Sequence, residues 1–339
     1  MKILLTGGTG QLGRCLLDRF PPGWEVDAPA HDTLDIVDAQ ATQAYVLAAK
    51  PDLIINTAAY NAVDRAESEP EQAFAVNQGG PAHLAQAAAQ TGAQLVHLST
   101  DYVFDGQGRI PQAGGRRSNA TTLHDVNQSP EVLAYAEDET PRPLNAYGLS
   151  KRAGEEAVLA ALPGAIVLRT SWLFSEYGRN FLKTMLRLAL PPAGADHATI
   201  RVVQDQTGCP TYAGDLAEAI ITLGRNMADQ HASTVAGGIY HYCGAQPMSW
   251  YAFARKIFTC MAELDGNAPV PEVIAISSAD YASAAPRPSV SALSCARLEA
   301  LGIRRIPLVE SLPPVMEKLV KRKPQSNTMA SRKPLPDAR

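Results

Sequence analysis

Short apolar runs alternate with amphipathic stretches through the first half of the chain. The apolar runs predict strands at residues 3–5, 24–28, 51–60, 93–104 and 165–174. The stretches between them repeat apolar residues at helical spacing and predict helices at 12–20, 41–50, 70–92 and 146–162. Because the runs are nearly continuous in apolar residues, each strand should be buried on both faces. The pattern therefore predicts an α/β fold with a doubly wound parallel sheet of the Rossmann type.

The alternation weakens after about residue 174. Helices are still predicted at 180–190 and 249–264, but the loops between them are rich in proline, glycine and serine. We expect residues 1–174 to form mainly a dinucleotide-binding Rossmann domain. Residues 175–319 should form mainly a smaller C-terminal region of mixed α/β structure that binds the substrate.

Two segments fit neither region. Residues 108–133 are rich in glycine, arginine and other polar residues, and we interpret them as a surface insertion. The insertion could act as a lid or bind a partner, although its composition favours a disordered loop. Residues 320–339 are basic and poor in large apolar side chains, which predicts a disordered tail. Docking of the tail to an anionic surface is an alternative.

Composition and charge narrow the classes of function. The chain is 46% hydrophobic and 19% charged, as in ordinary globular proteins, and its net charge of -4 gives no electrostatic reason to expect nucleic acid. The five cysteines are far apart and form no Cys-x-x-Cys pair, which predicts free thiols and a cytoplasmic location. No apolar run has membrane-spanning length, and the histidines are scattered. We therefore expect no membrane partner and assign no metal ligand.

The stretch "TGGTGQLG" follows the first predicted strand and opens the first predicted helix. Gly7, Gly10 and Gly13 have the spacing of a dinucleotide-binding loop. Gly8, Gly10 and Gly13 match a second form of the same motif. Glycines let the backbone approach a pyrophosphate, and the start of a helix offers unpaired N–H groups. The stretch predicts a bound nucleotide cofactor.

An acidic residue near the end of the second strand commonly binds the adenosine ribose. Asp27, Asp32 and Asp35 all lie in this part of the chain. We favour Asp35, with Ile36 beside it, because "TLDIVD" is typical of a loop that passes the adenine, whereas Asp27 is more typical of a solvated strand end. Arg14 could contact a ribose 2′-phosphate or be an exposed helix residue, so NADH and NADPH both stay open.

Polar residues follow two of the predicted strands, in "NTAAYNAVD" and "STDYVFDG". Thr100 and Asp101 therefore lie at the carboxyl edge of the sheet, where doubly wound folds bind their ligands. Tyr147 and Lys151 are four residues apart and share one face of a helix. A cation about 4 Å from a phenol contributes about 4 kcal/mol, so Lys151, helped by an oxidised nicotinamide, would bring the pKa of the phenol from about 10 toward neutrality. We interpret Tyr147 as a proton donor and acceptor, with Thr100 bonded to the carbonyl that is reduced.

With these residues in place, the chain is similar to the extended short-chain dehydrogenases/reductases. More narrowly, it resembles the dTDP-4-dehydrorhamnose reductase family from residue 1 to about 319. "GGTGQLG" and "PLNAYGLSK" are shared by the wider superfamily, whereas "DRAESEP", "STDYVFDG" and "DQTGCPT" point to the narrower family. The insertion at 108–133 and the tail depart from the family pattern.

The resemblance implies three groups of site residues. The catalytic residues would be Thr100, Tyr147 and Lys151. The cofactor would contact Gly7, Gly10, Gln11, Leu12, Gly13, Asp35, Ile36, Ala58, Ala59 and Tyr60, in addition to Tyr147 and Lys151. The substrate would contact Thr100, Asp101, Trp172, Val63, Asp64 and Arg287. Arg287 suits the diphosphate because a guanidinium binds phosphate oxygens in pairs, although it could also be an ordinary surface arginine.

The implied reaction reduces the C4 ketone of dTDP-4-dehydro-β-L-rhamnose to dTDP-β-L-rhamnose, using NADH or NADPH, in dTDP-rhamnose biosynthesis. Some family members are magnesium-dependent dimers, so the resemblance also raises Mg²⁺ and a homodimer, with no ligands that we can assign. One alternative is a reductase of another nucleotide 4-keto sugar. An epimerase or dehydratase fits less well, because Asp101 is the single acid that "STDYVF" offers. A third alternative is a non-catalytic regulatory subunit of the same fold.

Overall fold

The computed structural model describes residues 1–107, 122–123, 132–190, 198–228 and 235–321. Most of the predicted insertion and nearly all of the predicted tail lie outside these residues. Within the insertion, β5 (Thr122–Leu123) pairs with β6 (Val132–Leu133) in an antiparallel arrangement.

The centre of the molecule is a six-stranded sheet, and all of its strands run parallel. The strand order is β12-β7-β4-β3-β1-β2. The strands are β1 (Lys2–Thr6), β2 (Glu25–Asp27), β3 (Leu53–Asn56), β4 (Gln94–Thr100), β7 (Ile166–Thr170) and β12 (Gly238–His241). The predicted fold class is therefore confirmed. The order reverses beside β1, and doubly wound sheets bind nucleotides at this kind of reversal.

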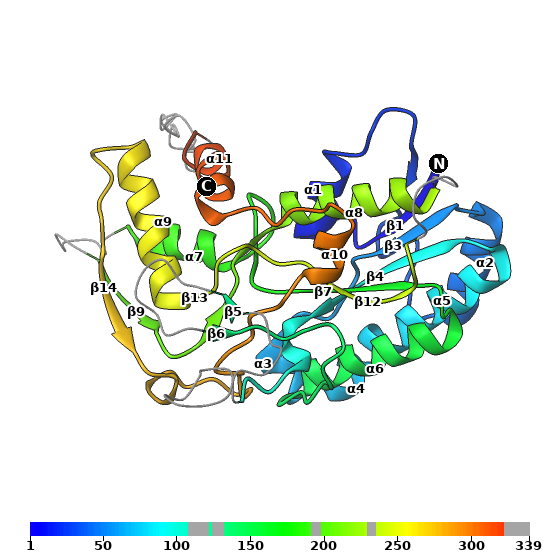
Figure 1. The fold of residues 1–339 in the computed structure, drawn as a ribbon, viewed down its shortest axis with the longest axis horizontal. Coiled ribbons are helices and arrows are strands. Elements are labelled where there is room, and N and C mark those ends of the chain that lie inside the picture. Colours follow the sequence, from blue (N-terminus) through cyan, green and yellow to red (C-terminus); the bar gives the residue numbers. More distant parts are fainter. Residues whose placement is uncertain (108–121, 124–131, 191–197, 229–234, 322–339) are drawn as a thin grey trace, which may run out of the picture.

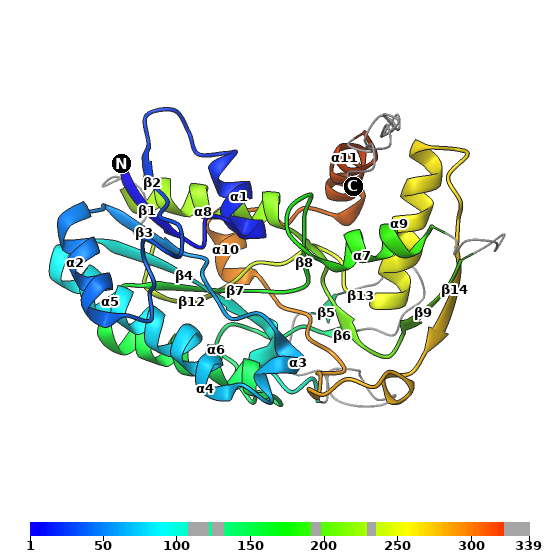
Figure 2. The same cartoon turned by 180° about the vertical axis from the view of Figure 1, so that it is seen from behind.

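Helices cover both faces of the sheet (Figure 1). On one face lie α1 (Gln11–Leu17), α8 (Ala213–Ala228) and α10 (Ala296–Ala300); on the other lie α2 (Ala39–Ala49), α5 (Gly80–Thr91) and α6 (Ala146–Ala161), as the reverse view in Figure 2 also shows. Side chains alternate along each strand, so Ile3 and Leu5 pack toward α1 and α8 while Leu4 packs toward α2 and α5. All three are fully buried, and each contributes about 1.5–3 kcal/mol of hydrophobic stabilisation.

Two predicted elements are interrupted. The predicted helix 70–92 is observed as α4 (Pro70–Phe74), a π-helical turn (Ala75–Gly79) and α5. The predicted strand 165–174 leaves the sheet after Thr170, and its last residues form β8 (Leu173–Phe174), which pairs with β11 (Thr211–Tyr212). The break falls at Trp172, whose φ of 46° lies in the left-handed region that non-glycine residues rarely adopt.

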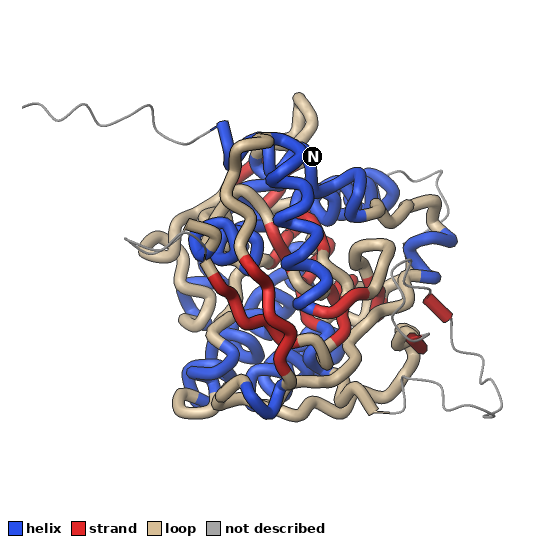
Figure 3. Tube along the Cα trace, turned by 90° about the vertical axis from the view of Figure 1, so that its left-hand side faces the viewer, coloured by secondary structure: helices blue, strands red, loops and turns tan. Residues whose placement is uncertain are grey.

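The later part of the chain builds a smaller region with a hydrophobic core of its own. Figure 3 views the molecule from this side. Its elements are α7 (Phe181–Leu188), β9 (Thr199–Val203), β10 (Thr207–Gly208), β13 (Met248–Ser249), α9 (Trp250–Leu264), β14 (Glu272–Ile276) and α11 (Leu308–Lys321). The region contains a parallel pair, β9 with β14, and a short antiparallel pair, β10 with β13. A short helix, α3 (Val63–Ala66), and a 3-10 turn (Asp101–Val103) follow β3 and β4.

The chain also returns from this later part to the first sheet. Helices α8 and α10 pack on one face of the sheet, and β12 pairs with β7 at its edge. Residues beyond 174 thus complete the Rossmann layer as well as forming the smaller region. The proposed division of labour between 1–174 and 175–319 stays a prediction.

Candidate active site

The glycine loop folds so tightly that side chains are excluded at two positions. Gly7 has a φ of +75°, and a Cβ there would lie 2.6 Å from the backbone nitrogen of Ala58. A Cβ on Gly13 would lie 2.3 Å from the carbonyl oxygen of Gly7. The Gly10 N–H donates to that same oxygen at 2.9 Å. The loop therefore presents bare backbone at the carboxyl end of β1, which fits a bound dinucleotide.

Two residues that follow the glycines have different surroundings. The side-chain oxygen of Gln11 accepts hydrogen bonds from Ser175 Oγ at 3.0 Å and Asn180 Nδ2 at 2.7 Å. Leu12 is buried in the core between α1 and the sheet. Gln11 thus ties the glycine loop to residues 175–180, and Leu12 could reach a cofactor through its backbone.

The acidic candidates near β2 differ in their hydrogen bonding. Both carboxylate oxygens of Asp27 accept from the Tyr45 hydroxyl, at 3.2 and 3.0 Å. Asp35 is exposed, and one of its oxygens accepts from the backbone N–H of Val37 at 3.0 Å. Ile36 is buried against α5, where a Cβ on Gly80 would lie 2.5 Å from it. The carboxylate of Asp35 is thus accessible from solvent, as a residue that binds the ribose has to be.

Arg14 contacts an aromatic residue of the segment that follows β8. Its guanidinium lies over the ring of Tyr177, 5.5 Å from the ring centroid. The Tyr177 hydroxyl in turn donates to Asp18 at 2.7 Å. This position gives no preference between the two interpretations of Arg14.

Thr100, Asp101 and Tyr147 meet at the carboxyl end of β4. The Thr100 hydroxyl donates to Asp101 Oδ1 at 3.0 Å and also hydrogen-bonds Tyr147. Tyr147 lies one residue into α6, whose N-cap Asn145 accepts from the Gly148 N–H at 2.8 Å. The ring of Tyr147 packs edge-to-face on Tyr102, with the centroids 6.0 Å apart. The predicted phenol and hydroxyl are therefore side by side.

The pKa of Tyr147 is shifted in the direction opposite to our expectation. Burial raises the pKa of the phenol to about 12, and the hydrogen bond with Thr100 offsets this effect only in part. Lys151 is also buried, and its ammonium group donates to the carbonyl of Leu98 at 2.5 Å. Burial lowers the pKa of Lys151 to about 8. The predicted lowering by Lys151 is therefore wrong for this structure, since loss of hydration dominates, and Tyr147 stays protonated at neutral pH.

An asparagine that the sequence did not single out holds this arrangement together. Asn77 lies in the π-helical turn, and its side chain accepts from the Tyr60 N–H at 2.9 Å and donates to the Tyr60 carbonyl at 3.1 Å. It also donates to Ser150 Oγ at 2.9 Å, and Ser150 donates to the carbonyl of Tyr147 at 2.8 Å. Asn77 thus joins the loop after β3 to the helix that carries Tyr147. No local sequence pattern distinguishes such a residue, because its partners are far along the chain.

A buried ion pair lies beneath the same helix. Glu155 of α6 accepts from Arg169 Nη2 at 2.7 Å and Arg169 Nε at 2.8 Å, and both side chains are 3% exposed. Ser99 of β4 also donates to Glu155. The pair therefore fixes α6 against two strands of the sheet.

Asp101 is buried, and its Oδ2 has no hydrogen-bond partner. Burial raises the pKa of its carboxyl from 3.8 to about 7, although the hydroxyls of Ser291 and Thr100 favour the charged form. Asp101 is thus a group whose charge changes near neutral pH.

This raised pKa predicts a pH-dependent stability. Between about pH 4 and about pH 7 the unfolded chain ionises Asp101 while the folded chain keeps it protonated, so unfolding releases a proton. The free energy of unfolding should therefore fall as the pH rises through this window, and this contribution should level off above it. In urea unfolding at several pH values, Asp101→Asn should lose this part of the slope, whereas the exposed control Asp138→Asn should keep it. Identical slopes in the wild type and Asp101→Asn would contradict the assignment.

Two predicted substrate residues, 223 positions apart, pair with each other. Asp64 of α3 accepts from Arg287 Nη2 at 3.0 Å and from the backbone N–H of Ala285 at 3.1 Å. Val63 is partly buried against Tyr147 and its neighbours. The Nε of Arg287 is buried and lacks a hydrogen-bond partner. Arg287 is therefore a partly buried cation held at the site, with a donor still available.

Trp172 lies in the break after β7, two residues beyond Thr170, which is paired with Thr100 in the sheet. Its indole stacks on Trp250, with the ring centroids 3.4 Å apart and an angle of 2° between the planes. A Cβ on Gly208 would lie 2.3 Å from Trp172 Cε2, so the backbone of Gly208 packs directly against this indole. Trp172 is thus near the catalytic edge, but other groups of the protein cover its ring.

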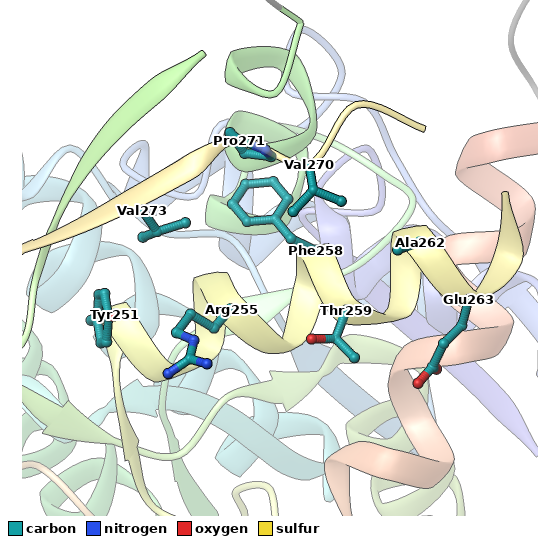
Figure 4. A pocket seen from close by; sticks show the side chains of 9 residues that line it. All are labelled: Tyr251, Arg255, Phe258, Thr259, Ala262, Glu263, Val270, Pro271 and Val273. Atoms are coloured by element: carbon teal, nitrogen blue, oxygen red, sulfur yellow. The ribbon is translucent and has the colours of Figure 1, made fainter. Parts of the chain in front are cut away.

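A cavity of about 500 Å³ lies elsewhere, between α9 and the chain leading into β14 (Figure 4). Its lining includes Arg255, Phe258 and Val273, and none of the predicted site residues lines it. Among the described residues, no three His, Cys, Asp or Glu side chains group closely enough to hold a metal ion. No helix in the described part of the chain has the length and apolar character needed to cross a membrane.

The parallel sheet and the relatives together define the class: this is a Rossmann-fold oxidoreductase. The chain belongs to the RmlD substrate binding domain family, whose model matches residues 1–320. A dTDP-4-dehydrorhamnose reductase from Sinorhizobium fredii is 39% identical over 305 residues, which cover 90% of this chain and 93% of that protein. The resemblance seen in the sequence is therefore confirmed.

Two further relatives bear on cofactor and substrate. The crystal structure of dTDP-4-dehydrorhamnose reductase from Bacillus anthracis in complex with NADP has a TM-score of 0.77 and 32% identity, covering 95% of this chain and 99% of that one. A probable dTDP-4,6-dihydroxy-2-methyloxan-3-one 4-ketoreductase from Streptomyces antibioticus is 36% identical over 323 residues, which cover 93% of this chain and 96% of that protein.

Proposed function

We propose that this protein reduces the C4 ketone of dTDP-4-dehydro-β-L-rhamnose to dTDP-β-L-rhamnose. The observation that carries the proposal is the close approach of Thr100 to Tyr147 at the carboxyl edge of the sheet, with Lys151 one turn further along the same helix, in a chain that is 39% identical to a reductase of this name over 90% of its length.

Each catalytic residue has a role that its surroundings support. Tyr147 donates the proton to the C4 oxygen, and its raised pKa keeps the phenol protonated until the oxygen becomes basic. The Thr100 hydroxyl, already bonded to Tyr147, orients the carbonyl. Lys151, one helical turn from Tyr147, would supply a positive charge that favours the phenolate left after the transfer. Asn77, through Ser150, keeps the start of α6 in place.

The nicotinamide cofactor supplies the hydride when it is bound. The cofactor's pyrophosphate would lie against Gly7, Gly10, Gly13 and the backbone of Gln11 and Leu12. Its adenosine would contact Asp35 and Ile36. The central part of the cofactor would contact Ala58, Ala59 and Tyr60. The NADP complex of the relative from Bacillus anthracis supports NADPH as the cofactor. NADH is the alternative cofactor.

The nucleotide sugar would lie between the two regions, with residues 1–174 mainly holding the cofactor and residues 175–319 mainly holding the substrate. Asp101 and Trp172 would contact the deoxysugar, with Val63 and Asp64 beside it. Arg287 would bind the diphosphate, because its unpartnered Nε can donate to a phosphate oxygen. Binding there would place the phosphate in competition with Asp64 for Arg287.

The test is to supply dTDP-4-dehydro-L-rhamnose and follow the oxidation of NADPH and NADH in separate assays. Oxidation with formation of dTDP-L-rhamnose is the expected result, faster with NADPH. No oxidation of either cofactor by a protein that still binds one would overturn the proposal.

A second candidate is the reduction of another nucleotide 4-keto sugar, which the relative from Streptomyces antibioticus supports. Running this assay with each ketosugar in turn decides between the two, because the second candidate predicts a higher kcat/KM for the other ketosugar than for dTDP-4-dehydro-L-rhamnose.

A further inference from the structure

The stacked indoles of Trp172 and Trp250 join the two parts of the molecule. Trp172 follows β7 of the large sheet, whereas Trp250 is the first residue of α9 in the smaller region. Their planes are parallel within 2° and their centroids are 3.4 Å apart, so each ring covers one face of the other. The backbone of Gly208 packs against the indole of Trp172, and β10 holds Gly208 beside Met248.

This packing conflicts with an open sugar site. A hexose ring binds an indole through the flat face of the ring, because its C–H groups point at the π system. Trp250 closes one face of the Trp172 indole, and the backbone of Gly208 packs against the same ring. If the sugar stacks on the face that Trp250 covers, Trp250 has to leave first.

Trp250 has a second aromatic partner that would remain when this stack opens. The ring of Phe181, the first residue of α7, lies 4.6 Å from that of Trp250, and Phe181 also packs on Phe253 at 5.5 Å. These three rings all belong to the smaller region. The contact that opens is therefore the one that crosses between the regions, and Trp250 keeps an apolar neighbour.

We propose that Trp250 is a shutter over the sugar-binding face of Trp172, and that the ring of the nucleotide sugar takes its place. The proposal rests on the proposed function, which makes Trp172 a sugar contact. The shutter also gives specificity. A ligand with a hexose ring restores the packing that Trp172 loses, whereas a nucleoside diphosphate that lacks the hexose restores nothing and leaves the stack closed.

The stack can be observed directly, because two parallel indoles in contact give an exciton couplet in far-ultraviolet circular dichroism. The chain has three tryptophans, and the third, Trp24, lies beside Phe20. We expect the couplet in the protein alone and with saturating dTDP, and its loss with saturating dTDP-L-rhamnose. Trp24→Phe should keep the couplet, and Trp250→Phe should abolish it. A couplet that persists after dTDP-L-rhamnose has bound, or that is missing from the free protein, would overturn the proposal.

Calorimetric titration provides the second measurement. Trp250→Ala removes a competitor of the sugar, so dTDP-L-rhamnose should bind about two- to tenfold more tightly, while the affinity for dTDP is unchanged. Weaker or unchanged binding of dTDP-L-rhamnose would contradict the shutter. If the wild type binds dTDP-L-rhamnose and the couplet persists, the shutter fails and the proposed function stands. If the wild type binds no dTDP-sugar and turns none over, both fail.

Discussion

Tyr147→Phe is expected to lower kcat by about 10²- to 10⁴-fold, while the nicotinamide nucleotide still binds within about twofold of the wild-type affinity. The substitution removes the phenolic hydroxyl, which is the group that donates the proton and bonds Thr100. It keeps the ring, and therefore the burial and the edge-to-face contact with Tyr102. Steady-state kinetics together with fluorescence titration of NADPH measure the two effects separately.

A matched control is available in Tyr240→Phe. Tyr240 is also a buried tyrosine, and its hydroxyl donates to the carbonyl of Ala236 at 2.7 Å, at the far edge of the sheet. Its loss should leave kcat within about twofold, at a cost of about 1 kcal/mol in stability. A Tyr147→Phe variant with kcat near that of this control would remove Tyr147 from the chemistry.

The largest effect on stability is expected for Glu155→Gln. The carboxylate of Glu155 neutralises Arg169, and both side chains are 3% exposed. Removing one partner leaves a buried charge without compensation, which costs about 3–5 kcal/mol. The Arg169 guanidinium would keep its cation–π contact with Phe104, 5.1 Å from the ring centroid. This contact is too weak to compensate for the lost carboxylate. Equilibrium unfolding in urea measures the loss.

The neighbouring residue gives the control for this experiment. Glu156 also lies on α6 and pairs with Arg152 at 2.9 Å, but its side chain is 65% exposed. Water screens this pair, so Glu156→Gln should change the free energy of unfolding by less than about 1 kcal/mol. If both variants lose a similar free energy of unfolding, burial is not the reason why the Glu155–Arg169 pair stabilises the fold.

The sequence predicted the parts of this molecule that depend on local pattern. Continuous apolar runs revealed β1, β2, β3, β4 and β7, and a polar residue at the end of β4 could be placed at the ligand edge because parallel strands end together. The spacing of Tyr147 and Lys151 was enough to put both on one helix face. Thr100 and Tyr147 are indeed in contact.

What the sequence did not reveal depends on pairing between distant residues. The four residues of β12 have no distinctive pattern, and they become a strand because β7 offers an unpaired edge. The contact of Asp64 with Arg287 and the stack of Trp172 on Trp250 join the two regions, so neither position shows its partner locally. The pKa of Tyr147 differs from the prediction because the sequence spacing shows the neighbouring cation but not the burial of the phenol.

Because β12 lies late in the chain, the large sheet cannot be completed until most of the protein has been translated. The large sheet has β12 as its outer strand beside β7, yet the whole of α7, β9 and α8 is translated before residues 238–241. At about 5–20 residues per second, the edge of β7 stays uncovered for several seconds after β7 itself is complete. An uncovered strand with the apolar sequence "IVL" is a template for pairing with other chains. The nascent protein is therefore most vulnerable to aggregation in this interval, before its own sixth strand arrives.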